Sequence, residues 1–143
     1  MQFDHEEHSL GFILNTTTSL IKRVMSAHMK QHDLTPEQFG VLMQLRMRDG
    51  ISQKKLAEVM YKDQPTVGKI IEKLESKGWV RREADPADRR AFVLRLTDEA
   101  SRKQNELQAL SDQMYIQAME GVTQEEFKEL IRIINKINRN LVK

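Results

Sequence analysis

The sequence predicts a mainly α-helical protein with one small β-hairpin, an α+β fold, in a chain of 143 residues. Two observations predict this class. Apolar residues recur at three- and four-residue steps over most of the chain, as they do on helices that bury one face. Between residues 79 and 96 the pattern changes to two short segments of β-forming residues on either side of a polar loop.

The N-terminal third is expected to form two helices. The first extends from residue 10 to about residue 32, and its stripe comprises Leu10, Ile13, Leu14, Thr17, Ile21, Val24 and His28. The second begins at a capping box formed by Thr35 and Gln38, with Pro36 at the first helical position. Gly50 is expected to end it, because glycine readily adopts the left-handed conformation that follows many helices.

Two closely spaced helices are expected next. Ser52 caps a short one, and Asp63 caps another after a turn that contains no glycine. The second of these extends from Gln64 to a stop at Gly78, although Pro65 disfavours helical geometry at Gln64 and so allows a later start. Its apolar residues are Val67, Ile70, Ile71 and Leu74, and the opposite face presents Pro65, Gly68, Lys69, Glu72, Lys73 and Ser76. One face is therefore predicted to be buried and the other to be polar and mostly basic.

A hairpin is the simplest interpretation of the segment that follows. Residues 79–83 and 91–96 are the expected strands, and residues 84–90 are the expected loop. Two adjacent arginines, Arg89 and Arg90, lie in this loop. The hairpin is therefore predicted to present positive charge at its tip.

Two further helices complete the expected fold. One extends from Thr97 to about Gly121, and the last begins at a second capping box of Thr123 and Glu126. The apolar seam of the last helix comprises Phe127, Leu130, Ile131, Ile134, Ile137 and Leu141. Long apolar stripes are thus expected at both ends of the chain.

Charge is distributed unevenly along the chain. The formal net charge is only +2, from 23 Lys and Arg against 21 Asp and Glu. Residues 52–96 hold 11 basic and 7 acidic residues, a net charge of +4, whereas each flank has a net charge of −1. This distribution is typical of a module that faces an anion, although a solvated surface of mixed charge also explains it.

Several function classes are excluded or disfavoured by composition. The absence of cysteine excludes disulfides, thiolate metal sites, thiol nucleophiles and thiol redox sensing. No apolar run reaches the roughly 20 residues of a membrane span, and no signal peptide is evident, so we expect a cytoplasmic protein with no membrane partner. The chain contains no nucleophile–base motif, phosphate-binding glycine loop or His-Glu-x-x-His motif, and we expect no enzyme activity.

The histidines are weak candidates for a metal site. His28 and His32 are four residues apart with Asp33 beside them, and His5 and His8 lie near the N-terminus. Such pairs are common by chance, and His28 falls on the apolar stripe of its helix. We therefore expect neither a metal nor a cofactor.

The order of elements in the middle third predicts a winged helix-turn-helix, a DNA-binding fold. A helix fits the major groove of B-DNA, and the preceding helix braces it against the backbone. An arginine at the tip of the hairpin, called the wing from here on, suits the narrow and electronegative minor groove. Gly68, placed on the outer face, is expected to let the helix backbone approach the duplex closely.

The segment from Leu56 to Ala100 resembles the MarR/SlyA family of bacterial transcriptional regulators. The resemblance rests on Leu56-Ala57-Glu58, on Asp63-Gln64-Pro65-Thr66-Val67 continuing through Leu74-Glu75-Ser76-Lys77-Gly78-Trp79-Val80, on the wing segment Asp85-Pro86-Ala87-Asp88-Arg89-Arg90, and on Val93-Leu94-Arg95-Leu96-Thr97. Outside residues 34–100 only the helical pattern matches. The resemblance implies a homodimeric regulator, a repressor, that binds a pseudo-palindromic operator in double-stranded DNA and is released by a small aromatic or phenolic effector.

The same resemblance implies a division of the chain and roles for individual residues. Residues 1–33 and 98–143 form the helical dimerisation region, and residues 34–97 form the winged helix-turn-helix lobe. In the wing, Arg90 enters the minor groove, Arg89 adds a backbone or groove contact, and Asp88 orients the arginines through a salt bridge.

On the helices, the resemblance implies that Gln64, Pro65, Thr66 and Lys69 lie at base edges and nearby phosphates, and that Ser52 and Lys73 lie on the sugar-phosphate backbone. By contrast, Arg81, Arg82 and Arg95 are expected to be solvated strand residues or ion-pair partners. Two alternatives remain open at this point. They are a metal-responsive regulator of the same fold and a winged-helix module that binds only proteins.

Overall fold

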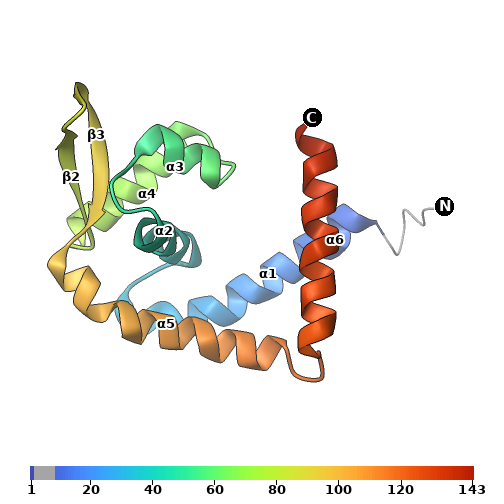
Figure 1. The fold of residues 1–143 in the computed structure, drawn as a ribbon. Coiled ribbons are helices and arrows are strands. Elements are labelled where there is room, and N and C mark those ends of the chain that lie inside the picture. Colours follow the sequence, from blue (N-terminus) through green and yellow to red (C-terminus); the bar gives the residue numbers. More distant parts are fainter. Residues whose placement is uncertain (2–8) are drawn as a thin grey trace.

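The computed structural model describes Met1 and residues 9–143 (Figure 1). The helices are α1 (Leu10–Met29), α2 (Pro36–Met47), α3 (Gln53–Val59), α4 (Gln64–Ser76), α5 (Asp98–Ala118) and α6 (Gln124–Val142), with a short 3₁₀ turn, η1 (Lys30–His32), after α1. The strands are β1 (Ile51–Ser52), β2 (Val80–Asp85) and β3 (Asp88–Leu96). The predicted mainly α-helical fold with one hairpin is confirmed.

The helices begin where their capping residues predict. The side chains of Ser52, Asp63 and Thr97 each accept a hydrogen bond from the backbone N–H three residues ahead. Thr35 and Thr123 form complete capping boxes, in which Gln38 and Glu126 also accept from the backbone N–H of the cap residue. These are local interactions, which is why the sequence predicts them well.

The sheet has one strand more and a shorter loop than the sequence predicts. The strand order is β1-β3-β2, and the two residues of β1 pair antiparallel with Val93 and Leu94. The β2–β3 ladder runs to Ala84 opposite Phe92, and after a shift in register Asp85 pairs with Asp88, so most of the expected loop is strand. Only residues 86 and 87 turn, because the Asp85 carboxylate accepts a 2.9 Å hydrogen bond from the Ala87 N–H and closes a tight turn.

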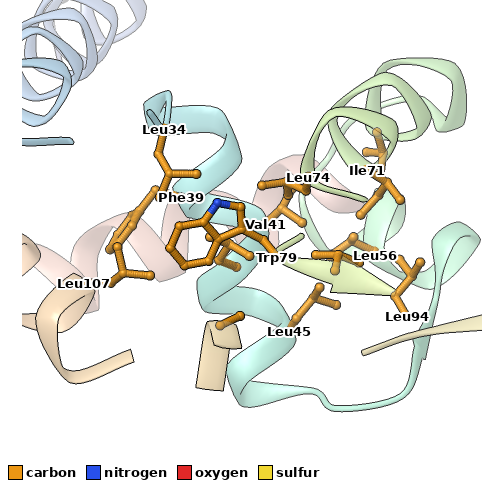
Figure 2. Packing of buried hydrophobic residues seen from close by; sticks show 14 of the residues in the cluster. Leu34, Phe39, Val41, Leu45, Leu56, Ile71, Leu74, Trp79, Leu94 and Leu107 are labelled. Atoms are coloured by element: carbon orange, nitrogen blue, oxygen red, sulfur yellow. The ribbon is translucent and has the colours of Figure 1, made fainter. Parts of the chain in front are cut away.

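The hydrophobic core joins α2, α3 and α4 to the sheet, to the last residue of α1, Met29, and to α5 as far as Leu110. In Figure 2 the buried side chains extend from Phe39 and Leu107 at one end to Leu56 and Leu94 at the other, with Trp79 between them. Burying each such side chain contributes about 1.5–3 kcal/mol to the free energy of folding. This core holds α3, α4 and the wing in a single lobe.

The N- and C-terminal helices form arms that leave apolar surface uncovered. Helices α1 and α5 contact each other and extend from the lobe toward α6, which stands apart from the lobe in Figure 1. No residue of α6 is buried. The exposed apolar side chains of α1 and α6 include Leu10, Phe12, Leu20, Leu130, Ile131, Ile133 and Leu141. In the described part of the chain, no helix is long and apolar enough to span a bilayer.

Candidate DNA-binding interface

Helix α4 begins at Gln64, directly after the predicted cap residue Asp63, and Pro65 does not shift its start to a later residue. Pro65 occupies the first turn, where a backbone N–H has no partner within the helix and its loss costs nothing. Asp63 caps the helix by accepting a 2.8 Å hydrogen bond from the Thr66 N–H. This hydrogen bond holds the pKa of Asp63 below its usual range.

The turn between α3 and α4 forms without glycine because Tyr61 takes the left-handed conformation. Its φ angle is 52°, a value that side-chain-bearing residues rarely adopt. The Lys62 N–H then donates to the Ala57 carbonyl, which closes the end of α3 at 3.0 Å. The side chain of Tyr61 is 82% exposed, so packing of the ring does not offset the backbone strain.

The exposed face of α4 presents the predicted contact residues to solvent. Those exposed there are Gln64, Pro65, Thr66, Lys69 and Lys73. Within residues 9–143, neither lysine forms an ion pair, and the Thr66 hydroxyl makes no hydrogen bond. The side of α4 opposite its buried residues is therefore an open cationic surface, as predicted.

Gly68 does not lie on this open surface, which corrects the sequence-based expectation. A Cβ at Gly68 would lie 3.1 Å from Nε2 of Gln53, which belongs to α3. The same Gln53 amide donates to the Gln64 carbonyl at 3.4 Å. Because α4 packs against α3 as well as α2, its buried face is wider than one apolar stripe, and Gly68 serves the close approach of α3 and α4.

Ser52 lies beside the base of the wing. It pairs with Val93 in the sheet, is half-buried, and accepts a 3.1 Å hydrogen bond from the Lys55 N–H through its hydroxyl oxygen. That oxygen caps α3, while the hydroxyl proton remains available for a second partner. Ser52 is thus both an N-cap and a candidate contact at the edge of the lobe.

The tip of the wing exposes Asp88, Arg89 and Arg90 at the start of β3. The expected salt bridge between Asp88 and these arginines is not formed. The Asp88 carboxylate instead accepts a 3.0 Å hydrogen bond from the backbone N–H of Arg90. A carboxylate two residues before an N–H reaches it easily, and this short contact competes with a long flexible arginine side chain. Both guanidinium groups therefore stay open among the described residues.

The base of the hairpin is neutralised by ion pairs, as expected for these arginines. Arg81 pairs with Glu83, and Arg82 Nε lies 2.9 Å from Oε1 of Glu75 at the end of α4. Arg95 contacts Glu83 as well and lies 2.9 Å from Oδ2 of Asp49. Among the described residues, the basic side chains of the middle third without an ion pair are Lys54, Lys62, Lys69, Lys73, Arg89 and Arg90, and the last four lie on the outer face of α4 and the wing tip.

No metal site is assembled in the described residues. His28 and His32 are both half-buried, and no group of three or more metal-ligating side chains forms in residues 9–143. The other two histidines, His5 and His8, lie outside the described residues.

Comparison with known proteins agrees with this architecture. The MarR family model matches residues 34–92. The chain is 28% identical over 133 residues to the HTH-type transcriptional regulator SarZ of Staphylococcus haemolyticus, which covers 93% of this chain and 89% of SarZ. The family-model match includes every candidate contact residue from 52 to 90, and the match to SarZ extends into both arms.

Two solved structures share the fold over nearly the whole chain. A mutant form of E. coli MarR complexed with operator DNA has a TM-score of 0.84 at 23% identity, covering 96% of this chain and 99% of that one. BpsR of Bordetella bronchiseptica, whose DNA binding is regulated by 6-hydroxynicotinic acid, has a TM-score of 0.83 at 23% identity, covering 96% and 98%. The lobe thus matches the MarR family model over residues 34–92, and the whole chain shares the fold of the solved MarR structure.

Proposed function

We propose that this chain is a DNA-binding transcriptional regulator that represses transcription by occupying a pseudo-palindromic operator as a homodimer. The observation that supports this most is the distribution of unpaired cations on the lobe. Lys69, Lys73, Arg89 and Arg90 are open, whereas the arginines at the base of the hairpin are paired with carboxylates. Such a surface suits phosphates and groove edges rather than a neutral partner.

The geometry supports a separate role for each part of the surface. Helix α4 is the recognition helix, and Gln64, Pro65, Thr66 and Lys69 reach base edges and nearby phosphates in the major groove. Ser52 and Lys73 bind the sugar-phosphate backbone. In the wing, Arg90 enters the minor groove, Arg89 adds a second contact, and Asp88 fixes the backbone from which both arginines extend.

The arms supply the dimer. The apolar faces of α1 and α6 lie uncovered on the single chain, and burial of such faces is the usual driving force for association. Residues 1–33 and 98–143 therefore form the dimerisation region in this proposal, and residues 34–97 form the DNA-binding lobe. A two-fold axis then places two recognition helices in successive major grooves, with half-site centres about one helical turn apart. The protein acts on cytoplasmic DNA and performs no catalysis.

A small aromatic effector is the proposed release signal. BpsR is regulated by such a molecule, and this chain has an apolar groove of about 250 Å³ between Leu20, Ile21 and Val24 of α1 and Met114 of α5. An effector shifts the equilibrium only if it binds the DNA-competent and DNA-incompetent arrangements with different affinities. The cysteine-free chain excludes thiol oxidation as the control.

A titration against duplex DNA tests the proposed function. Wild-type protein should bind a fluorescent duplex of random sequence, and the logarithm of its affinity should fall linearly with the logarithm of the salt concentration. Arg90→Ala should weaken binding several-fold. Arg81→Ala is the matched control, because it removes a hairpin arginine already paired with Glu83. Absence of binding at low salt, or equal losses for the two variants, would contradict the proposal and favour a module that binds only proteins.

A further inference from the structure

The C-terminal end of the recognition helix α4 is attached to both arms within three residues. Lys77, its C-cap residue, reaches back to the junction between α1 and α2. The next two residues, Gly78 and Trp79, contact the start of α5. These contacts attach the end of α4 to the arms in addition to the shared core, which includes Met29 of α1 and Leu107 of α5.

On the N-terminal side, the ammonium group of Lys77 sits among three oxygen atoms. Its Nζ lies 2.5 Å from the Asp33 carbonyl oxygen and 3.0 Å from Oε1 of Gln38, to both of which it donates. It also lies 3.7 Å from Oδ2 of Asp33. The Lys77 side chain is only 26% exposed, in contrast to the open Lys69 and Lys73 on the same helix. The Lys77 ammonium group therefore binds oxygen atoms of its own chain, whereas, within the described part of the chain, those of Lys69 and Lys73 are free to contact DNA.

The groups that accept hydrogen bonds from Lys77 lie at the junction between the N-terminal arm and the lobe. Asp33 follows η1, takes a left-handed conformation with a φ angle of 53°, and precedes the cap of α2. Gln38 is 4% exposed, and its Oε1 also accepts from the Thr35 N–H, so it fixes the first turn of α2. Lys77 therefore spans the segment where the N-terminal arm meets the lobe.

On the C-terminal side, the attachment is made by the backbone. The Thr97 hydroxyl donates to the Gly78 carbonyl at 2.7 Å, and the Thr97 N–H donates to the Trp79 carbonyl at 3.1 Å. Lys103 of α5 lies 5.4 Å from the centre of the Trp79 ring. Residues 78–79 and Thr97 adjoin the two strands of the wing directly along the chain. On the side of the N-terminal arm, by contrast, the attachment is made by the Lys77 side chain.

We infer that Lys77 is a positioning residue that fixes the angle between the recognition helix and the N-terminal arm, and through it the half-site spacing that the dimer prefers. This inference rests on the proposed function. The core residues Val67, Ile71 and Leu74 hold α4 within the lobe, so loss of the tie leaves the lobe folded. What is lost is the side-chain attachment of α4 to the arm, so that the angle between them then depends on the core packing of Met29. Lys22 and Glu37 also pair across this junction at 3.2 Å, but that pair is more exposed and does not touch α4.

The first test measures the distance between the two recognition helices of the dimer in the absence of DNA. Because the chain has no cysteine, Glu72→Cys places one spin label on the exposed face of each α4 in the dimer. The distance distribution between the two labels should be narrow in this background and clearly broader once Lys77→Met is added. Lys77→Arg, which keeps the charge and the donors, should restore part of the narrowing. An unchanged distance distribution in Lys77→Met would overturn the inference, whatever the result of the DNA-binding experiments.

The second test measures spacing preference on DNA. Palindromic duplexes that differ by one base pair in the distance between half-sites are titrated with each protein. Wild type should prefer its best spacing about tenfold, equivalent to about 1.4 kcal/mol, and Lys77→Met should reduce that preference to about threefold or less. Lys73→Met is the matched control, because loss of a phosphate contact should weaken all spacings by the same factor.

The outcomes separate this inference from the proposed function. A uniform loss for Lys77→Met, like that of the control, would assign Lys77 to DNA contact and overturn the positioning role. A wild-type protein without any preference for half-site spacing would instead contradict the proposed function, in which a dimer binds two half-sites at a fixed distance. Thermal melting verifies that each variant is folded, and Lys77→Gln, which keeps an amide donor in the half-buried site, replaces Lys77→Met if the latter unfolds.

Discussion

At the scale of single residues, the side chains that begin helices act through contacts three residues away. Asp63, Thr35 and Thr123 were predictable for this reason, since their partners are visible in the adjacent sequence. The partners of Lys77, and Asp49 as a partner of Arg95, lie 39 to 46 positions away and could not be read from a local pattern. Tyr61 lies between these two cases. The sequence shows that the turn between α3 and α4 contains no glycine, but it does not show which residue adopts the left-handed conformation.

Tyr61 provides a direct test of backbone strain. Tyr61→Gly should raise the free energy of unfolding by about 1 kcal/mol, because glycine adopts a positive φ angle without the steric cost of a Cβ atom. The neighbouring Lys62→Gly is the control, and it should lower the free energy of unfolding by about 0.4–1 kcal/mol through the entropy of the unfolded chain. Urea unfolding measures both. A loss of stability in Tyr61→Gly would show that the exposed ring contributes more than the backbone costs.

The cap of α4 predicts a specific pH dependence. The hydrogen bond from the Thr66 N–H lowers the pKa of Asp63 in the folded state. Its stabilising contribution is therefore complete above the unfolded-state pKa of about 3.9, and it is lost as the pH falls through the lower folded-state pKa. The free energy of unfolding of wild type should fall more steeply below about pH 4 than that of Asp63→Asn, which caps without titrating. Identical acid profiles would contradict the assignment.

At the scale of elements, α4 and the wing differ from the expectations in instructive ways. The apolar stripe predicts the buried face of α4 correctly, but a helical wheel places Gly68 on the exposed face. The wheel does not show that both α2 and α3 pack against α4. The strands of the wing extend further toward the tip than propensity indicates, although their register shifts between Ala84 and Asp85. Arg89 and Arg90 therefore lie within β3, at this shift in register, instead of on a long loop.

The outer face of α4 should behave as a phosphate contact. Lys73→Ala should weaken binding to specific and random duplexes by similar factors, and it should reduce the salt slope by about 1 for each protomer bound. Lys128→Ala, on an exposed part of α6, serves as the charge-matched control and should leave the slope unchanged. A loss confined to one base position of the operator would show that Lys73 reads sequence.

At the scale of the whole molecule, the chain is a well-packed lobe with two arms that are incomplete alone. The core comprises residues from 29 to 110 and includes nothing from α6. The sequence predicted long apolar stripes at both ends, but their separation from the core depends on how the helices are arranged in space (Figure 1).

Removal of α6 tests this separation. Deletion of residues 123–143 should abolish dimerisation while the lobe still unfolds cooperatively, because α6 buries no residue against its own chain. Sedimentation equilibrium measures the mass and circular dichroism measures the unfolding. A truncated chain that remains dimeric would exclude α6 from the interface, and one without a cooperative transition would show that the lobe depends on the dimer.

The central claim is that two such lobes, held by the arms, read two half-sites related by a two-fold axis. Selection of wild-type protein on a library of random duplexes tests binding, symmetry and spacing together. We expect enrichment of an inverted repeat whose half-site centres lie about one helical turn apart. Enrichment of no motif, or of a single half-site without a partner at fixed distance, would contradict it.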